Sequence, residues 1–288
     1  MTSNGYKIVR LANGVHCVHS LAHGETFHPV IGPVAEAEAL YVKQLRLLER
    51  MGGHRGEFVI WDVGLGAAAN ALTVLRAARG ISCSIRMVSF DQTLEALEFA
   101  LDHAQTLGYF GGYEQRLPPL LRAHQAAFLD AGARVEWELH LGDFPTLLAG
   151  ALRRLPGRPL PAPHAILFDA FSPARNPAMW TLPLFTGLFG LLDPERPCAL
   201  PTYSRSTMLR VTLLLAGFYV GAGHATGEKE ETTIAANTLE LIDEPLDRIW
   251  LARARRSTSA EPLREPVYRQ APLCVGTWEK LEEHPQFK

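Results

Sequence analysis

The feature that most constrains the fold is a strand–turn–helix unit that starts at residue 57. The stretch FVIWDVG is apolar on both faces, and GLG then leads into the helical pattern ANALTVLRAARG. A strand without polar alternation is typical of a parallel sheet that helices cover on both sides. Similar strands follow, each separated from the next by a helical pattern or a loop: 84–91, 134–143, 164–171, 198–204, 218–225 and 232–238. This alternation predicts an α/β fold with a doubly wound parallel sheet.

The chain divides into three predicted parts. Residues 1–54 form an N-terminal appendage, with a β-hairpin over 6–20 and a helix over 34–51 that Gly52 and Gly53 end. Residues 55–242 form the main α/β domain, with an inserted helical excursion at 111–125. Residues 243–288 are rich in Pro and Arg, and we expect a tail that wraps the domain or is partly disordered.

Composition excludes several classes of protein. The chain has 288 residues, of which 47% are hydrophobic and 20% charged, so it can bury a large core and is not a disordered chain. Its apolar runs are too short to span a bilayer, and we expect no signal peptide. The cysteines (Cys17, Cys83, Cys198 and Cys274) are far apart, which fits a reducing cytoplasm. The sequence leaves the oligomeric state open.

The net charge of −2 means that any binding of nucleic acid requires a local basic patch. Two groups of arginines are candidates for such a patch: Arg153, Arg154 and Arg158, and Arg248, Arg253, Arg255 and Arg256. A solvated surface is the alternative interpretation of both groups.

The turn after the first strand carries Asp62, Gly64 and Gly66. Glycines at this place let the backbone approach a ligand. Ala68 stands where a dinucleotide-binding turn would have its third glycine. An acid before the glycines repels a pyrophosphate but suits the ammonium group of S-adenosylmethionine (SAM). The turn therefore predicts a SAM site, with a purely structural tight turn as the alternative.

Three further acids follow strands at the same predicted edge of the sheet. Asp91 is expected to accept the ribose hydroxyls of the cofactor, and Asp143 to contact its adenine. Each acid could instead cap the next helix. Asp169 is expected to hold or deprotonate an attacking amine, with a loop tied by Asx-turns as the alternative. A rigid wall follows Asp169, and its members are Phe171, Pro173, Asn176, Pro177 and Trp180.

The N-terminal histidines suggest a metal site only weakly. His16 and Cys17 alternate on a strand and therefore point to opposite faces. His19, His23 and His28 do not complete a standard metal-ligand spacing, so we expect no metal.

The stretch LFDAFSPARNPAMWTLPLF closely resembles the signature of the SAM-dependent methyltransferase domain of the bifunctional tRNA 5-methylaminomethyl-2-thiouridine biosynthesis enzymes. The stretches DVGLGAAAN, SFD, LGD and ALPTYSRSTMLRVTLLLAGFYV are similar to other family motifs in the same order. The resemblance spans about residues 15–236. It implies a Rossmann-like methyltransferase fold and methyl transfer from SAM to the aminomethyl nitrogen of a wobble uridine in tRNA.

Residue by residue, the resemblance implies that Gly64, Gly66, Asp91 and Asp143 bind SAM, with Asp62 and Asn70 beside them, and that Asp169 handles the amine proton. Tyr203 falls in a matching motif and is assigned to the substrate side with the wall. The FAD-dependent oxidase half of the family has no counterpart here, so the chain resembles a stand-alone methyltransferase. A small-molecule methyltransferase, an aminopropyltransferase similar to spermidine synthase, and a non-enzymatic sensor of SAM or a nucleoside are the alternatives.

Overall fold

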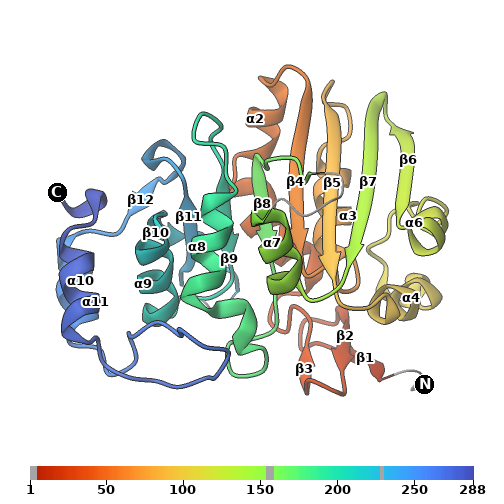
Figure 1. The fold of residues 1–288 in the computed structure, drawn as a ribbon. Coiled ribbons are helices and arrows are strands. Elements are labelled where there is room, and N and C mark those ends of the chain that lie inside the picture. Colours follow the sequence, from red (N-terminus) through yellow and green to blue (C-terminus); the bar gives the residue numbers. More distant parts are fainter. Residues whose placement is uncertain (1–4, 154–158, 228–229) are drawn as a thin grey trace. The chain divides into compact units, whose positions relative to one another are not determined.

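The structure is a computed structural model that describes residues 5–153, 159–227 and 230–288 (Figure 1). Its described residues divide into two compact units. Unit 1 comprises residues 1–143, 165–169 and 225–230, and unit 2 comprises residues 144–164, 170–224 and 231–288.

Unit 1 is built on a sheet of strand order β8-β4-β5-β7-β6. Its strands are β4 (Glu57–Val63), β5 (Ser84–Asp91), β6 (Gln125–Asp130), β7 (Ala133–Leu141) and β8 (Ala165–Phe168). β4 pairs in parallel with β5 and with β8, and β5 pairs in parallel with β7. Phe58 to Val63 and all of β8 are buried, as the apolar runs predict.

The helices that follow β4 and β5 are α3 (Ala69–Ala77), α4 (Glu95–Asp102) and α5 (Ala104–Leu107). Buried residues run without interruption from Ala69 to Leu75, so α3 is enclosed on every side over that stretch. A predicted helical insertion at 111–125 is confirmed only in part. It contains the short helix α6 (Pro118–Ala123), and the strand β6 that follows it pairs antiparallel to β7 and was not expected from the sequence.

The N-terminal segment forms a small antiparallel sheet of β1 (Tyr6–Arg10), β2 (His16–Ser20) and β3 (Glu25–Thr26), so the predicted hairpin is confirmed. The single helix expected over 34–51 is wrong. The structure has α1 (Pro33–Ala37), the π-helical turn η1 (Glu38–Lys43) and α2 (Leu47–Gly52), with Arg46 in the left-handed region at φ 46°. Leu40, Tyr41 and Val42 are consecutive and all buried. A regular α-helix with one buried face would expose at least one of three consecutive side chains, whereas the wider π-helical turn buries all three.

Unit 2 contains strands in the order β12-β10-β11-β9. They are β9 (Ala199–Thr202), β10 (Tyr219–Gly223), β11 (Thr232–Ala236) and β12 (Glu244–Pro245), and α9 (Thr207–Ala216) joins β9 to β10. β11 lies between β9 and β10 and is antiparallel to both. The expectation of a parallel sheet is therefore wrong for this part of the chain. The helix α9 connects β9 to β10 without pairing them, and β11 inserts between them in the antiparallel direction.

The buried guanidinium of Arg210 ties α9 to β11. Arg210 is 3% exposed, and it donates to the Thr233 hydroxyl (3.0 Å), the Thr232 carbonyl (2.7 Å) and the Glu231 carboxylate (3.2 Å). Burial lowers the pKa of this guanidinium. A buried cation that is hydrogen-bonded at several nitrogens fixes one arrangement of the helix and the strand.

The remaining elements of unit 2 are short helices: α7 (Phe144–Leu152), η2 (Pro177–Trp180), α8 (Leu182–Gly190), η3 (Leu239–Leu241), α10 (Arg248–Arg255), α11 (Val275–Glu282) and η4 (Pro285–Phe287). The C-terminal region is more regular than its composition predicts. Trp250, Leu251 and Leu281 are buried, and Gln286 donates to the Val220 and Leu246 carbonyls. Partial disorder of residues 243–288 was therefore the wrong expectation for the described chain.

The predicted domain boundaries at 54/55 and 242/243 stay predictions. The two compact units of the structure have different boundaries. Within the described residues, we find no helix with the length and apolarity that crossing a bilayer requires.

Gly221 in β10 provides a test of the sheet in unit 2. A Cβ at Gly221 would lie 2.3 Å from Ile242 Cγ2 and 2.6 Å from the Glu244 carbonyl oxygen, so only glycine lets β12 pair beside it. We expect Gly221→Ala to lower the free energy of unfolding by about 2 kcal/mol or more, since overpacking typically costs about 1–3 kcal/mol. Urea denaturation measures this change.

Gly276→Ala is the matched control. Gly276 lies in α11, and a Cβ added there would meet nothing within 4 Å, so alanine should stabilise the helix by about 0.5–1 kcal/mol. Equal effects of the two substitutions would contradict this account of β12.

Candidate active site

The carboxyl ends of three parallel strands meet in unit 1. Val63, the last residue of β4, is paired with Phe90 of β5 on one side and with Phe168 of β8 on the other. The backbone N–H of Asp169 donates to the Val63 carbonyl (3.0 Å), and that of Gly64 donates to the Phe90 carbonyl (3.0 Å). The chain therefore leaves all three strands at one level, and the acids predicted at these ends belong to one region.

The glycine turn after β4 is fastened to the end of β5. Gly64 and Gly66 have positive φ angles of 93° and 51°, and the Gly66 N–H donates to Asp91 Oδ2 at 2.7 Å. A Cβ at Gly66 would lie 3.2 Å from the Phe27 ring. Ala68, at the position of a third glycine, also has a positive φ of 60° and directly precedes α3. The turn therefore keeps the geometry of a glycine-rich loop although an alanine occupies one of its left-handed positions.

Asp91 contacts backbone amides with both carboxylate oxygens. Besides the bond from Gly66, its Oδ1 accepts from the Gln92 N–H at 2.7 Å. Burial raises the pKa of Asp91, and the hydrogen bonds from Gly66, Thr93 and Gln92 oppose that rise. Helix α4 begins later, at Glu95, so Asp91 does not cap it. The capping alternative considered for Asp91 is therefore wrong.

Asp62 lies inside β4 and is 1% exposed. Its Oδ2 accepts from the Ser89 hydroxyl (2.8 Å), which in turn accepts from the Trp137 indole N–H (2.9 Å). Its Oδ1 is buried and has no hydrogen-bond partner among the described residues. Burial raises the pKa of Asp62 to about 7, the Ser89 bond opposes the rise, and the charges of Asp91 and Asp169 add to it.

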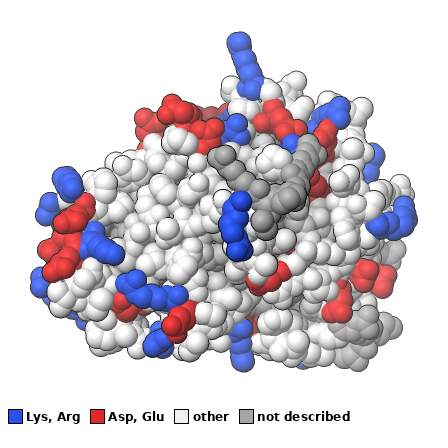
Figure 2. Space-filling view, in the orientation of Figure 1, with Lys and Arg blue, Asp and Glu red and all other residues white. Residues whose placement is uncertain are grey.

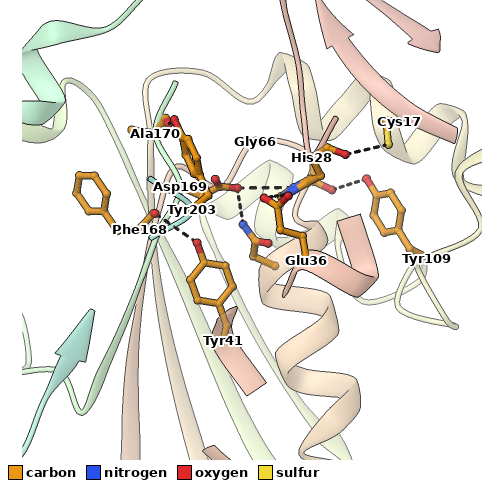
Figure 3. Close-up of polar contacts among 12 residues, drawn as sticks. Cys17, His28, Glu36, Tyr41, Gly66, Tyr109, Phe168, Asp169, Ala170 and Tyr203 are labelled. Carbon is orange, nitrogen blue, oxygen red and sulfur yellow. Dashed lines mark hydrogen bonds and ion pairs between the residues drawn. The ribbon is translucent and has the colours of Figure 1, made fainter. Parts of the chain in front are cut away.

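Two side-chain nitrogens, one an amide donor and one of an imidazole, lie near one oxygen of Asp169 (Figure 3). Asn70 Nδ2 donates to Asp169 Oδ2 at 2.8 Å, and His28 Nε2 lies 3.6 Å from the same oxygen. The preceding carbonyl, that of Phe168, accepts from the Tyr41 hydroxyl at 3.3 Å. The position of Asp169 at the end of β8 is thus fixed by side chains from the helix after β4 and from the N-terminal segment.

His28 and Glu36 are the site residues that sequence analysis missed as a pair. Both are buried, and His28 Nδ1 lies 3.3 Å from Glu36 Oε1. Burial lowers the pKa of His28, but the charge of Asp169 and the hydrogen bond and charge of Glu36 raise it more, so the net shift is upward from 6.5. Their spacing of eight residues crosses a loop and gives no periodic signal. The sequence signs were the dense histidine set and the stretch GPVAEAEALYV, which contains Glu36 and resembles the substrate-side N-terminal segment of the family.

The predicted wall belongs to unit 2 and is anchored by two aromatic side chains. The Trp180 indole N–H donates to the Phe171 carbonyl (2.7 Å), and the Tyr203 hydroxyl donates to the Ala170 carbonyl (3.0 Å). The Trp180 and Tyr203 rings meet edge to face with centroids 6.1 Å apart. Trp180 is fully buried, so it holds the backbone of this loop in place.

The rest of the wall is a turn followed by η2. The backbone N–H groups of Arg175 and Asn176 donate to the Ser172 carbonyl, and Pro177 begins η2 after Asn176. Phe171, Pro173, Asn176 and Pro177 are partly exposed. These residues are accessible from solvent on a fixed backbone.

Asp143 is exposed at the end of unit 1, directly before α7. Arg248, Arg253, Arg255 and Arg256 are exposed on or next to α10, and Arg153 is exposed after α7. Arg154 and Arg158 lie outside the described residues. On the face shown in Figure 2, the described basic side chains are interspersed with acidic ones and form no continuous band.

No group of three or more His, Cys, Asp or Glu side chains has a metal-binding arrangement in the described part of the chain. The titratable groups that interact with one another in unit 1 include Asp62, Asp91, Asp169, Glu36 and His28.

Part of this chain matches a known enzyme family. Residues 113–238 match the model of a family described as S-adenosyl-L-methionine-dependent methyltransferase. The chain carries a SAM-dependent methyltransferase domain. The predicted cofactor, SAM, is that of the matched family, and the aminopropyltransferase alternative is not favoured.

Two curated relatives are named tRNA 5-methylaminomethyl-2-thiouridine biosynthesis bifunctional protein MnmC. The protein of Methylibium petroleiphilum is 30% identical, and the match covers 82% of this chain and 35% of the length of that protein. The protein of Aeromonas hydrophila is 29% identical, and the match covers 80% of this chain and 35% of the length of that protein. The chain therefore spans about a third of the length of these relatives. The resemblance to their methyltransferase half is confirmed.

A crystal structure of MnmC2 from Aquifex aeolicus has a TM-score of 0.68 at 21% sequence identity, and covers 98% of this chain and 84% of that one. This likeness confirms the predicted Rossmann-like methyltransferase fold. The roles of individual site residues stay predictions.

The buried carboxyl of Asp62 predicts a pH dependence of stability in this methyltransferase domain. An unfolded Asp has a pKa near 3.9, whereas Asp62 in the folded protein has one of about 7. Between these values the folded state binds more protons at this residue than the unfolded state, so its contribution to the free energy of unfolding falls as pH rises.

Asp62→Asn imitates the protonated acid and removes this dependence. We expect the stability of Asp62→Asn relative to wild type to increase steadily from pH 4.5 to pH 8 in urea denaturation. Exposed Asp102→Asn at the end of α4 is the control and should leave the pH profile unchanged. Parallel profiles of wild type and Asp62→Asn would show that Asp62 ionises normally.

Proposed function

We propose that this chain transfers a methyl group from SAM to an amine, namely the aminomethyl group of a modified wobble uridine in tRNA. The observation that carries the proposal is Asp169, which leaves a parallel strand beside the glycine turn and is held at Oδ2 by Asn70 and His28. The curated relatives, whose names place them in the biosynthesis of a methylaminomethyl uridine of tRNA, support the choice of acceptor.

We propose that Asp62, Gly64, Gly66, Asn70, Asp91 and Asp143 hold the cofactor. The residues of unit 1 fit a cationic ligand because buried oxygens of Asp62 and Asn70 have no partner among the described residues. Gly66 adds a backbone without a Cβ beside Phe27. SAM supplies an electrophilic methyl group on a positively charged sulfur.

Asp169 is the proposed catalytic residue. An alkylamine with a pKa near 10 is protonated at neutral pH and has no lone pair to offer. The Asp169 carboxylate takes a proton from the ammonium group and orients the amine that remains. With SAM bound, methyl transfer would form the nitrogen–carbon bond and leave the electron pair of the broken carbon–sulfur bond on sulfur. Asp169 would then release its proton to water.

The wall residues Phe171, Pro173, Asn176, Pro177 and Trp180, with Tyr203, are proposed to shape the acceptor side. Their fixed backbone would restrict the approach of the nitrogen, and positioning of this kind lowers the barrier to bimolecular transfer. Because tRNA is the proposed acceptor, we place the reaction in the cytoplasm.

The decisive experiment is methyl transfer from labelled SAM to tRNA that carries the unmethylated aminomethyl uridine, followed by nucleoside analysis. We expect Asp169→Ala to lower the single-turnover rate by about 10²–10⁴-fold, the usual range for a general base, with little change in SAM affinity. Asp169→Asn should recover orientation but not basicity, and higher pH should partly rescue both variants because more amine is then neutral.

Asp102→Asn serves again as the matched carboxylate control and should retain the wild-type rate. Rates of Asp169→Ala within a few-fold of wild type between pH 7 and 9.5 would reduce Asp169 to a structural loop residue. Methylation of small amines, and of no tRNA, would favour the small-molecule alternative.

The exposed arginines of α10 are the proposed local contact with RNA. Replacing Arg253, Arg255 and Arg256 together by Glu should weaken tRNA binding and reduce its dependence on salt, since each phosphate contact contributes to the salt slope. Filter binding at several salt concentrations measures both quantities, and calorimetry should show unchanged SAM binding.

The matched control replaces the exposed Arg116, Arg122 and Arg134 of unit 1 by Glu, which changes the net charge by the same amount. Equal losses of tRNA affinity in the two triple variants would reveal an effect of net charge and contradict a contact on α10.

A further inference from the structure

We infer that His28, held by Glu36, is a positioning residue of the methyl-transfer site, and that its imidazolium fixes Asp169 and keeps it ionised. The inference rests on the proposed function and adds residues that the signature around Asp169 does not contain. His28 comes from the loop before α1, and Glu36 from α1 itself.

The geometry places the imidazole between two carboxylates. His28 Nδ1 lies 3.3 Å from Glu36 Oε1, and His28 Nε2 lies 3.6 Å from Asp169 Oδ2. Both ring nitrogens therefore face acceptors, and only the doubly protonated imidazolium can donate from both. The side chains of His28 and Glu36 are 7% and 6% exposed, so solvent screens this ion pair little.

Two carboxylates and one thiol contact His28 in the described part of the chain. Glu36 faces it from α1 and Asp169 from the end of β8, and the Cys17 thiol of β2 contacts its backbone carbonyl at 3.8 Å. Burial raises the pKa of Cys17 to about 12, so this thiol stays neutral. Asp62 interacts electrostatically with Asp91 and with Asp169. A cation at His28 therefore opposes the uptake of a proton by the Asp169 carboxylate.

The backbone of His28 is held as firmly as its ring. His28 has a positive φ of 52°, which side chains other than glycine seldom adopt. The Phe27 N–H donates to the Val18 carbonyl (2.9 Å), and the Ile31 carbonyl accepts from the Asn13 side chain (3.1 Å). Gly227 packs so tightly on this loop that a Cβ there would lie 2.4 Å from Ile31 Cγ2 and 2.8 Å from Val30 Cγ1.

His28 acts through Asp169 in this arrangement. The carboxylate must be ionised before it can accept the proton of the acceptor ammonium, and it must return that proton to solvent after transfer. A fixed imidazolium stabilises the anion at each turnover and itself neither gains nor loses a proton. Glu36 contributes by keeping the imidazole charged.

The first experiment titrates the His28 ring by NMR in the full chain, in wild type, Glu36→Gln and Asp169→Asn. We expect the wild-type pKa of His28 to lie above 6.5 and to fall in each variant, because each loses one of the two neighbouring charges. A wild-type pKa at or below 6.5 would overturn the inference, whatever the acceptor of the methyl group proves to be.

The second experiment measures single-turnover methyl transfer to tRNA between pH 5.5 and 9. His28→Gln should lower the rate by about 10–100-fold at pH 6 and by less at pH 9, because an adjacent cation shifts carboxyl ionisation by about one to three pH units. Glu36→Gln should have no further effect when combined with His28→Gln, and His28→Gln none when combined with Asp169→Asn.

His19→Gln is the matched control. His19 is a half-buried histidine of β2 that contacts Thr26, and its replacement should leave the pH profile unchanged. A loss of rate in His28→Gln that is equal at all pH values, or one that adds fully to Asp169→Asn, would make His28 merely structural. Absence of tRNA methylation by wild type would overturn the proposed function, while the NMR titration still decides the charge of His28.

Discussion

The parallel pairing of β4 with β5 and with β8 is the constraint on which the site depends. Parallel strands end at the same edge, and here the shared register is Val63 with Phe90 and with Phe168. Asp91 and Asp169 leave the sheet on either side of the glycine turn for this reason, and neither could be moved by one residue without reversing the face of its strand. Hydrogen bonds from Gly64 and Asp169 to neighbouring strand carbonyls then extend the pairing one step beyond the sheet.

Carboxylates that lie close together repel one another when they are ionised. The three acids at this edge of the sheet differ in the groups that surround them. Asp91 is surrounded by backbone N–H groups, which favour its anion. Asp62 accepts from one hydroxyl among the described residues, and burial raises its pKa to about 7. Asp169 has an amide and an imidazole on one oxygen. The environment of each carboxyl group therefore sets its charge, although all three belong to one small region.

The sequence predicted those parts of the molecule whose local residue pattern determines burial, backbone angle or position. The apolar runs of β4 and β8, the positive φ angles of Gly64 and Gly66, and the order of the acids along the chain are all readable locally. His28 and Glu36 were missed because their pairing depends on a loop that three-dimensional contacts hold in place. The π-turn at Glu38–Lys43 and the strand β6 were missed for a similar reason, since tertiary burial decides both.

The position of β11 has a consequence for the order in which unit 2 can form. β9 and β10 are joined by α9 and are close in the chain, yet neither pairs with the other, since β11 takes the hydrogen bonds on both facing edges. Residues 232–236 are synthesised last of the three strands. Until they arrive, a nascent chain exposes two open strand edges, which are templates for pairing with other chains. The facing edges of β9 and β10 therefore stay unpaired until this single antiparallel strand is in place.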